Sequence, residues 1–129
     1  IIIMLVPVSN GELMDKYTIL LIKKEFIQDL TKTNYVNQEI TYLLEYVNKI
    51  KTTYNIDELF NKLIKVNKKL WVIEDELRVK EKKKEFDKEF IELARSVYFT
   101  NDERAVLKKQ INEDTDSNIF EVKSYEKYN

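Results

Sequence analysis

The chain has a single proline and a single glycine, Pro7 and Gly11, which lie close together near its start. Both residue types interrupt helices: proline lacks a backbone N–H, and glycine has the most conformational freedom to lose on folding. The sequence after Gly11 contains neither residue and is rich in Lys, Glu, Leu and Ile, which favour helices. This distribution predicts an all-α fold, an antiparallel bundle of about four long helices.

The length and charge of the chain limit its organisation and its partners. A chain of 129 residues with 43% hydrophobic residues suits one helical domain with one core. We expect an extended start over residues 1–8, a helical bundle over 9–113 and an extended tail over 114–129. The net charge of −1 argues against a nucleic-acid partner, because neutralising phosphates needs a basic face. The basic run at residues 80–85 is interrupted by glutamates, which is typical of a solvated helix end.

Two residue types that carry much of protein chemistry are absent. Without cysteine there is no disulfide or thiolate, and without histidine the commonest general base and zinc ligand are missing. The apolar start, residues 1–6, is too short to span a membrane and lacks the flanks of a signal peptide. We expect a cytoplasmic protein with no membrane partner, no cofactor and no bound metal. Met4 is a candidate initiator, so whether residues 1–3 belong to the natural protein stays open.

Capping patterns and apolar spacing place the four helices. Ser9 and Glu12 form a capping box, S-x-x-E, in which each side chain would satisfy a free amide at the start of the first helix. Two apolar stripes on this helix predict that it is central and well buried. Asn55 is the predicted cap of the third helix, and Asp87 marks a break before the fourth. The four predicted helices span about 9–33, 34–53, 56–84 and 87–113.

Both ends of the chain have the composition of strands. An up-down-up-down bundle places the entry to the first helix and the exit from the last at the same end. We therefore expect the start and the tail to pair as a small sheet or to lie along each other. A two-stranded ribbon is marginal by itself, so it would need support from the bundle or from a second subunit. Gly11 has no capping role, and we expect that it lets another backbone, the tail, come close.

An acidic pair in the first helix is the first candidate site. Glu12 and Asp15 project from one helix face, and Lys16 follows them. Such a pair is half of a magnesium site of the kind used by all-helical nucleotide pyrophosphatases, with Glu74 and Asp75 as the second half. The favoured interpretation is that Glu12 caps the helix while Asp15 and Lys16 form ion pairs.

Two further groups of polar residues fall on apolar helix faces. Asn67 and Asn101 are expected near mid-height of neighbouring antiparallel helices, where they would bond to each other and fix the register. Arginine is scarce in this lysine-rich chain, and an arginine indicates a bidentate or stacked contact. We interpret the third group as a semi-buried salt-bridge network, with an anion pocket as the alternative. Its members are Trp71, Glu74, Asp75, Arg78, Arg95 and Tyr98.

The sequence also resembles a known family along most of its length. The resemblance begins at Val6-Pro7-Val8-Ser9 and Gly11-Glu12-Leu13 and is densest over residues 90–108, including Thr100-Asn101-Asp102-Glu103-Arg104. The family consists of small bacterial and phage-borne proteins and is catalogued only as a domain of unknown function. The resemblance implies no activity, but it marks residues to test. These are Asp15, Lys16, Asn67, Trp71, Glu74, Arg78, Arg95, Asn101 and Arg104.

Two classes of function remain open from the sequence. The favoured one is a non-enzymatic, homo-oligomeric helical module that binds a protein partner, because the first helix is apolar on two faces and both ends are β-prone. The alternative is a small-anion binder or enzyme that uses Arg78, Arg95 and neighbouring carboxylates. No nucleophile can be paired with a base in the usual way without histidine or cysteine, so catalysis is the weaker expectation.

Overall fold

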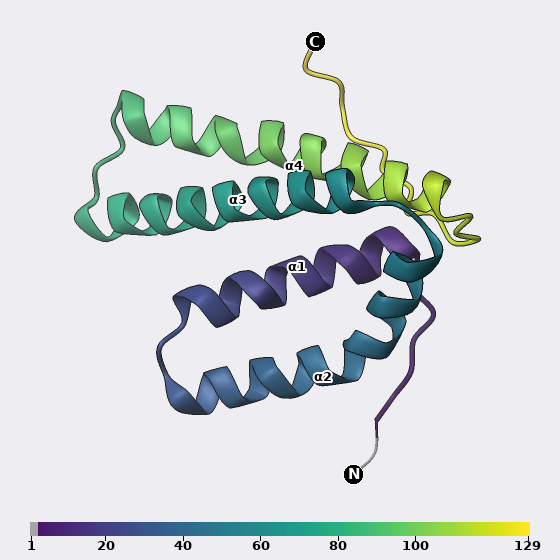
Figure 1. Ribbon diagram of the computed structural model, residues 1–129. Coiled ribbons are helices and arrows are strands. Elements are labelled where there is room, and N and C mark those ends of the chain that lie inside the picture. Colours follow the sequence, from purple (N-terminus) through teal and green to yellow (C-terminus); the bar gives the residue numbers. More distant parts are fainter. Residues whose placement is uncertain (1–2) are drawn as a thin grey trace.

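The computed structural model describes residues 3–129, and it confirms the all-α architecture (Figure 1). The four helices form two antiparallel hairpins, one from the first pair and one from the second (Figure 1). Helix α1 packs against each of the other three helices, while α2 packs mainly on α1. The prediction that the first helix is central is therefore confirmed. The helices are α1 (Asn10–Phe26), α2 (Leu30–Thr53), α3 (Asp57–Lys83) and α4 (Lys88–Asp114).

The helix ends agree with the predictions to within one residue except at the junction of α1 and α2. The Asp87 side chain accepts a hydrogen bond from the Phe90 amide at 2.9 Å, as a break and restart at this position requires. Helix α1 ends earlier than predicted, because Ile27 is extended and Asp29 caps α2 by accepting from the Lys32 amide. The predicted cap at Asn55 is wrong, since Ile56 holds the cap position of α3 without a side-chain bond.

The capping box of α1 is only half formed. Ser9 Oγ accepts a hydrogen bond from the Glu12 amide at 3.0 Å, which satisfies one of the free donors of the first turn. The Glu12 carboxylate does not return to Ser9 but bonds to Lys108 Nζ of α4 at 2.7 Å. A long-range ion pair has replaced the local contact, and it attaches the start of α1 to α4.

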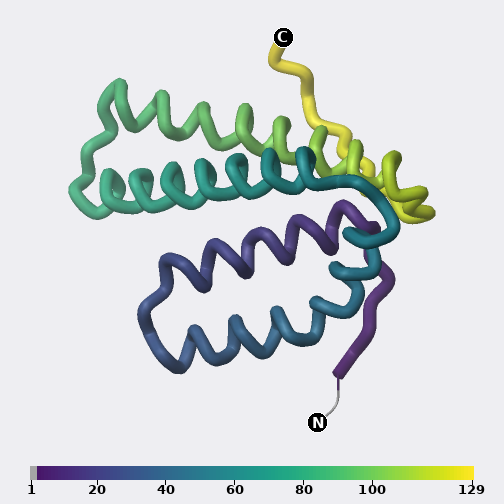
Figure 2. The backbone as a smooth tube through the Cα atoms, viewed as in Figure 1, coloured from purple at the N-terminus to yellow at the C-terminus, as the bar shows by residue number. Residues whose placement is uncertain are grey.

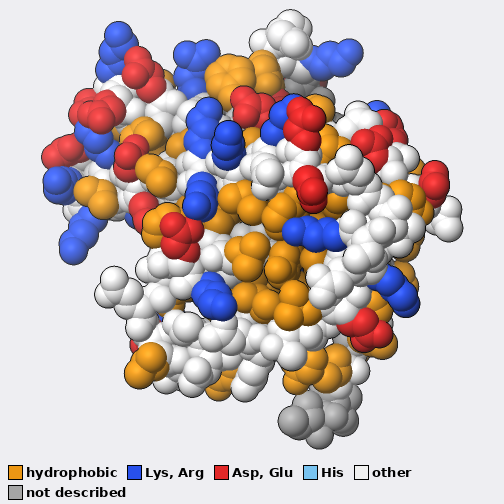
Figure 3. Space-filling model, in the orientation of Figure 1, with side chains coloured by type: hydrophobic (Ala, Val, Ile, Leu, Met, Phe, Trp, Pro, Cys, Tyr) orange, Lys and Arg blue, Asp and Glu red, His pale blue; other side chains and the backbone are white. Residues whose placement is uncertain are grey.

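The hydrophobic core has two parts on either side of α1. The larger part draws on all four helices and includes Met14, Val47, Leu63 and Ile111, all almost completely buried. The smaller part joins Leu20 of α1 to α2. On the face shown in Figure 3, apolar side chains gather over α1, while charged ones gather over the far ends of α3 and α4. These outer ends pack on each other beyond the reach of α1 (Figure 1).

The start of α1 and the turn that follows α4 meet at one end of the bundle. Asn10 of α1 donates through its amide to Ser117 Oγ at 3.2 Å and through Nδ2 to Thr115 Oγ1 at 2.9 Å. Figure 2 shows the start of α1 beside the turn that follows α4. The expected pairing of the extended start with the tail is not confirmed, because residues 3–8 make no hydrogen bond to the tail and no strand occurs between residues 3 and 129. The side chains of Asn10, Thr115 and Ser117 hold the junction, so backbone pairing is not needed to close it.

Gly11 allows a close approach, but the neighbour is α4 and not the tail. A Cβ atom on Gly11 would lie 2.3 Å from the Lys108 carbonyl oxygen and 2.9 Å from Asn112 Oδ1. The Gly11 amide donates to the same Asn112 Oδ1 at 2.6 Å. The glycine therefore sets the separation of α1 and α4 where the polar groups described below meet.

Candidate functional site

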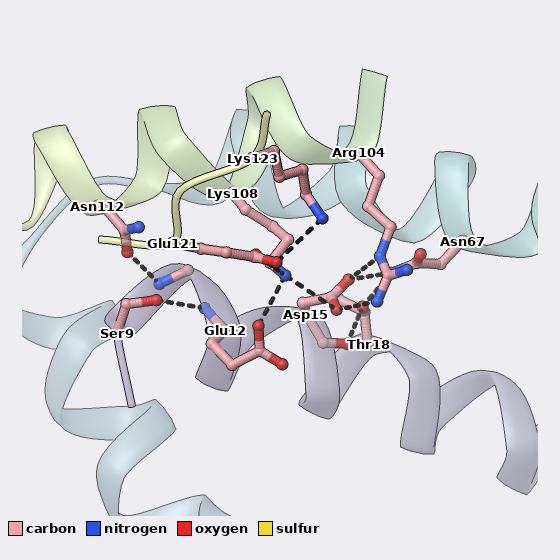
Figure 4. Close-up of polar contacts among 11 residues, drawn as sticks. Ser9, Glu12, Asp15, Thr18, Asn67, Arg104, Lys108, Asn112, Glu121 and Lys123 are labelled. Carbon is pink, nitrogen blue, oxygen red and sulfur yellow. Dashed lines mark hydrogen bonds and ion pairs between the residues drawn. The ribbon is translucent and has the colours of Figure 1, made fainter. Parts of the chain in front are cut away.

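A buried carboxylate lies at the centre of the helix contacts. The Asp15 side chain on α1 is 1% exposed. Its Oδ1 accepts from Asn67 Nδ2 of α3 at 2.9 Å and from Arg104 Nε of α4 at 2.8 Å, and its Oδ2 accepts from Arg104 Nη2 (Figure 4). Thr18 Oγ1 accepts a second bond from Asn67 Nδ2 and donates to the Asp15 carbonyl. These four side chains join three helices, and we call them the Asp15 network.

The Asp15 network keeps its charges because each one is paired. A buried ionised group costs several kcal/mol unless it is paired and hydrogen-bonded. The Arg104 guanidinium binds the carboxylate in a bidentate manner, the strongest geometry available to such a pair. The hydrogen bond to Asp15 raises the pKa of Arg104 above its ordinary value, so the cation persists at any physiological pH.

A second set of charges lies one helical turn along α4. The Lys108 side chain is 10% exposed, and Nζ contacts Glu12 Oε2 at 2.7 Å and Glu121 Oε2 of the tail at 3.0 Å (Figure 4). Burial alone would lower the pKa of Lys108, but the hydrogen bonds to Glu12 and Glu121 outweigh burial and raise it. Lys108 thereby connects α1, α4 and the tail.

The tail carboxylate is held between two ammonium groups. Lys123 Nζ lies 3.0 Å from Glu121 Oε1, opposite the oxygen that Lys108 binds. The contacts with Lys123 and Lys108 lower the pKa of Glu121 below its ordinary value. We call Glu121, Lys108 and Lys123 the tail clamp.

We expect the tail clamp to open in acid. A carboxyl whose pKa is lowered in the folded protein stabilises the docked tail above its ordinary pKa and loses this effect as pH falls through the lowered value. The Glu121 carboxyl signal in an NMR titration should therefore have its midpoint below the ordinary range of glutamate. In Lys123→Gln the midpoint should move upward, because the largest cause of the shift is gone. An unchanged midpoint in this variant would contradict the clamp.

Both members of the predicted acidic pair, Glu12 and Asp15, form ion pairs with α4. Glu12 binds Lys108 and Asp15 binds Arg104, so both carboxylates face cations of α4. Lys16 points elsewhere and forms an ion pair with Glu39 of α2 at 2.7 Å. Among residues 3–129, no three acidic side chains gather closely enough to hold a metal ion. The magnesium alternative has no support from this geometry.

The predicted bond between Asn67 and Asn101 is wrong. Asn67 is buried and structural, as expected, but its amide donates to Asp15 and Thr18 of α1. Asn101 is exposed on α4 beside the tail. The periodicity of each helix indicated the correct buried face for Asn67, but it could not show that this face meets α1 and not Asn101 of α4.

The predicted Arg/Glu cluster does not assemble into one site. Trp71 stacks on Phe26 of α1, with ring centroids 5.9 Å apart. Arg78 binds Glu74 at 2.6 Å on the surface, while Asp75 is exposed. Arg95 contacts Tyr98 on its own helix: its Nε donates to the Tyr98 hydroxyl at 3.4 Å. Within the described part of the chain, no ion pair links Arg95 to Glu74, so the cluster consists of separate surface contacts.

Sequence reasoning missed most of the partners of Asp15 and Glu12. Arg104, Lys108 and Asn112 follow one another at four-residue spacing on α4, which places them on one helix face. Three polar residues in this spacing, opposite an acidic pair at the start of α1, are the pattern that could have identified the site. The role of Glu121 had no such pattern, because it lies in a segment without regular structure.

Comparison with known proteins identifies a family but no activity. No curated protein and no solved structure matches this chain significantly. A family model described as a family of unknown function, DUF6165, matches residues 4–128. The match includes α1, both sets of charged residues on α4 and the tail clamp, and it agrees with the resemblance inferred from the sequence. The chain belongs to this family of unknown function, DUF6165.

Proposed function

We propose that the protein is a non-enzymatic assembly module that binds a second copy of itself through its N-terminal segment. The observation that carries this proposal is the exposure of residues 3–8, which we call the arm. Five apolar side chains of the arm face solvent: Ile3 is 53% exposed, Met4 86%, Leu5 81%, Val6 71% and Val8 47%. Such a concentration of exposed apolar side chains on one short segment marks an interaction site.

The backbone of the arm favours pairing with another extended segment. Among residues 3–129, no hydrogen bond joins the arm to any other residue. An extended segment with free N–H and C=O groups is a template for strand pairing, and β-branched Ile, Val and aromatic residues favour that state. Two copies related by a two-fold axis could pair arm to arm, which gives a closed dimer.

The apolar area of the arm is large enough to matter for association. Burying one Leu or Val side chain contributes about 1.5–3 kcal/mol, so three of the arm residues would supply roughly 5–9 kcal/mol. Association itself costs at least about 4 kcal/mol, and the surplus corresponds to weak or moderate dimerisation. Pro7 limits strand pairing at one position, which keeps the ribbon short.

A charge in the arm should dissociate the dimer. Wild-type protein is expected to have the mass of a dimer by light scattering at millimolar concentration, because a surplus of at most about 5 kcal/mol corresponds to a dissociation constant of roughly 0.2 mM or weaker. Leu5→Asp should have the mass of a monomer, because the dimer would bury an unpaired carboxylate. Val79→Asp is the matched control, since Val79 is 52% exposed on the far end of α3. A monomeric wild type, or equal loss of mass in both variants, would contradict the proposal.

The alternative of an anion site at Arg78 and Arg95 has less support. Both arginines are exposed and bind residues of their own helices. The carboxylates expected to assist them do not converge on Arg95.

In residues 3–129, no helix is long and apolar enough to cross a membrane.

A further inference from the structure

A cleft lies between α4 and the C-terminal tail, away from the arm. It encloses about 970 Å³, within the range of small-molecule sites, roughly 300–1,000 Å³. The tail is attached at two points and crosses the cleft between them. The tail clamp is one attachment; the other is Tyr128, whose ring contacts those of Tyr98 and Phe99 at 5.3 and 5.0 Å and whose hydroxyl donates to Asp102.

Cationic side chains line the cleft, and most of them are already paired with carboxylates beside it. Four cations line it, Arg104, Lys108, Lys123 and Lys127, against two acids, Asp102 and Glu126. One of the acids, Asp102, already accepts a hydrogen bond from Tyr128. The side chain of Lys108 is only 10% exposed, and its charge is balanced by Glu12 of α1 and by Glu121 of the tail.

The tail clamp shows which chemistry the cleft accepts. The Glu121 carboxylate is bound at one oxygen by Lys108 and at the other by Lys123, each at 3.0 Å. Two ammonium groups on opposite oxygens are an arrangement for a carboxylate or phosphate. Because Glu121 belongs to an exposed tail, its carboxylate can leave while Lys108 remains at the base of the cleft.

Aromatic side chains also line the cleft. Tyr98, Tyr125 and Tyr128 line it together with the aliphatic Val106. Aromatic walls near a cationic base suit a ligand with an apolar, planar body and one anionic group. We propose that this cleft binds a small aromatic anion, whose carboxylate or phosphate replaces the Glu121 carboxylate between Lys108 and Lys123.

The test compares an open and a closed tail clamp with benzoate and phenyl phosphate as probes. In wild type, Glu121 competes with the probe. The apparent affinity of the site equals its intrinsic affinity multiplied by the fraction of molecules in which Glu121 is not bound there. Glu121→Gln keeps the shape of the side chain and removes the competing charge. Calorimetry should therefore show that this variant binds benzoate about 3- to 10-fold more tightly than wild type. Lys123→Gln should weaken binding below wild type. Tyr128 keeps the tail attached in both variants.

Glu126→Gln is the matched control, because it removes the same charge from the same tail and from the lining of the same cleft. An equal gain in both glutamine variants would mean that net charge alone acts, and it would overturn the proposal. Equal binding of benzamide, the neutral analogue of benzoate, would also overturn it. So would a lack of binding by both probes to wild type and Glu121→Gln. None of these results depends on the arm, so a failure here leaves dimerisation as a separate question.

Discussion

Replacing Gly11 with alanine should lower the free energy of unfolding by about 2 kcal/mol or more, the upper part of the range for overpacking. The added Cβ would lie 2.3 Å from the Lys108 carbonyl oxygen, a distance that no side-chain rotation can relieve. Helices α1 and α4 would have to move apart, which would lengthen the contacts of Asp15 and Glu12 with α4. Urea denaturation followed by circular dichroism measures the change.

The sign of the change in unfolding free energy distinguishes the steric contact with α4 from the higher helix propensity of alanine. In a solvent-exposed helix, glycine to alanine stabilises by about 1 kcal/mol. Gly11 is buried and its closest neighbour is a backbone atom of α4. The steric cost of the added Cβ should therefore exceed the gain in helix propensity. Asn112→Ala removes the other close atom, Oδ1 at 2.9 Å, and should not rescue Gly11→Ala. A stabilised Gly11→Ala, or full rescue by Asn112→Ala, would show that α4 does not limit the approach.

The sequence was sufficient to predict the helices because their pattern is local. The absence of proline and glycine after Gly11, the cap at Asp87 and the apolar spacing of α1 all act within a few residues. The same local patterns failed at Asn55, where the burial of Ile56 in the core decides the start of α3. They also placed the end of α1 too late, because the Asp29 cap competes with continued helix.

The candidate site was harder to predict because its partners are distant in the sequence. Asp15 and Asn67 were recognised as unusual polar residues on helix faces, but their partners depended on which helices are neighbours. Arg104 was marked only by the family resemblance, as a residue to test, although it makes the bidentate contact with Asp15. Glu121 binds Lys108 from a segment without periodicity, and no spacing rule reaches such a contact. Predicting contacts between helices requires knowledge of which helices are neighbours, and the periodicity of a single helix does not provide it.

Replacing Asp15 with asparagine should lower the free energy of unfolding by about 3–5 kcal/mol. Asparagine fits the space but brings an amide against the Arg104 guanidinium, so two donors face each other. Arg104 would lose its bidentate partner while its side chain is only 29% exposed. Chemical denaturation should show this loss as a lower midpoint with an unchanged slope.

Glu74→Gln is the matched control for Asp15→Asn, because it removes the same charge from an ion pair with an arginine. The Arg78 and Glu74 side chains are 75% and 46% exposed, and such a surface pair contributes at most about 1 kcal/mol. Combining Asp15→Asn with Arg104→Met should cost less than the sum of the single changes, since the second removes the cation that the first leaves unpaired. If Asp15→Asn costs no more than Glu74→Gln, the Asp15 network does not hold the three helices together. The difference between the two losses therefore measures what burial adds to the same pair of charges.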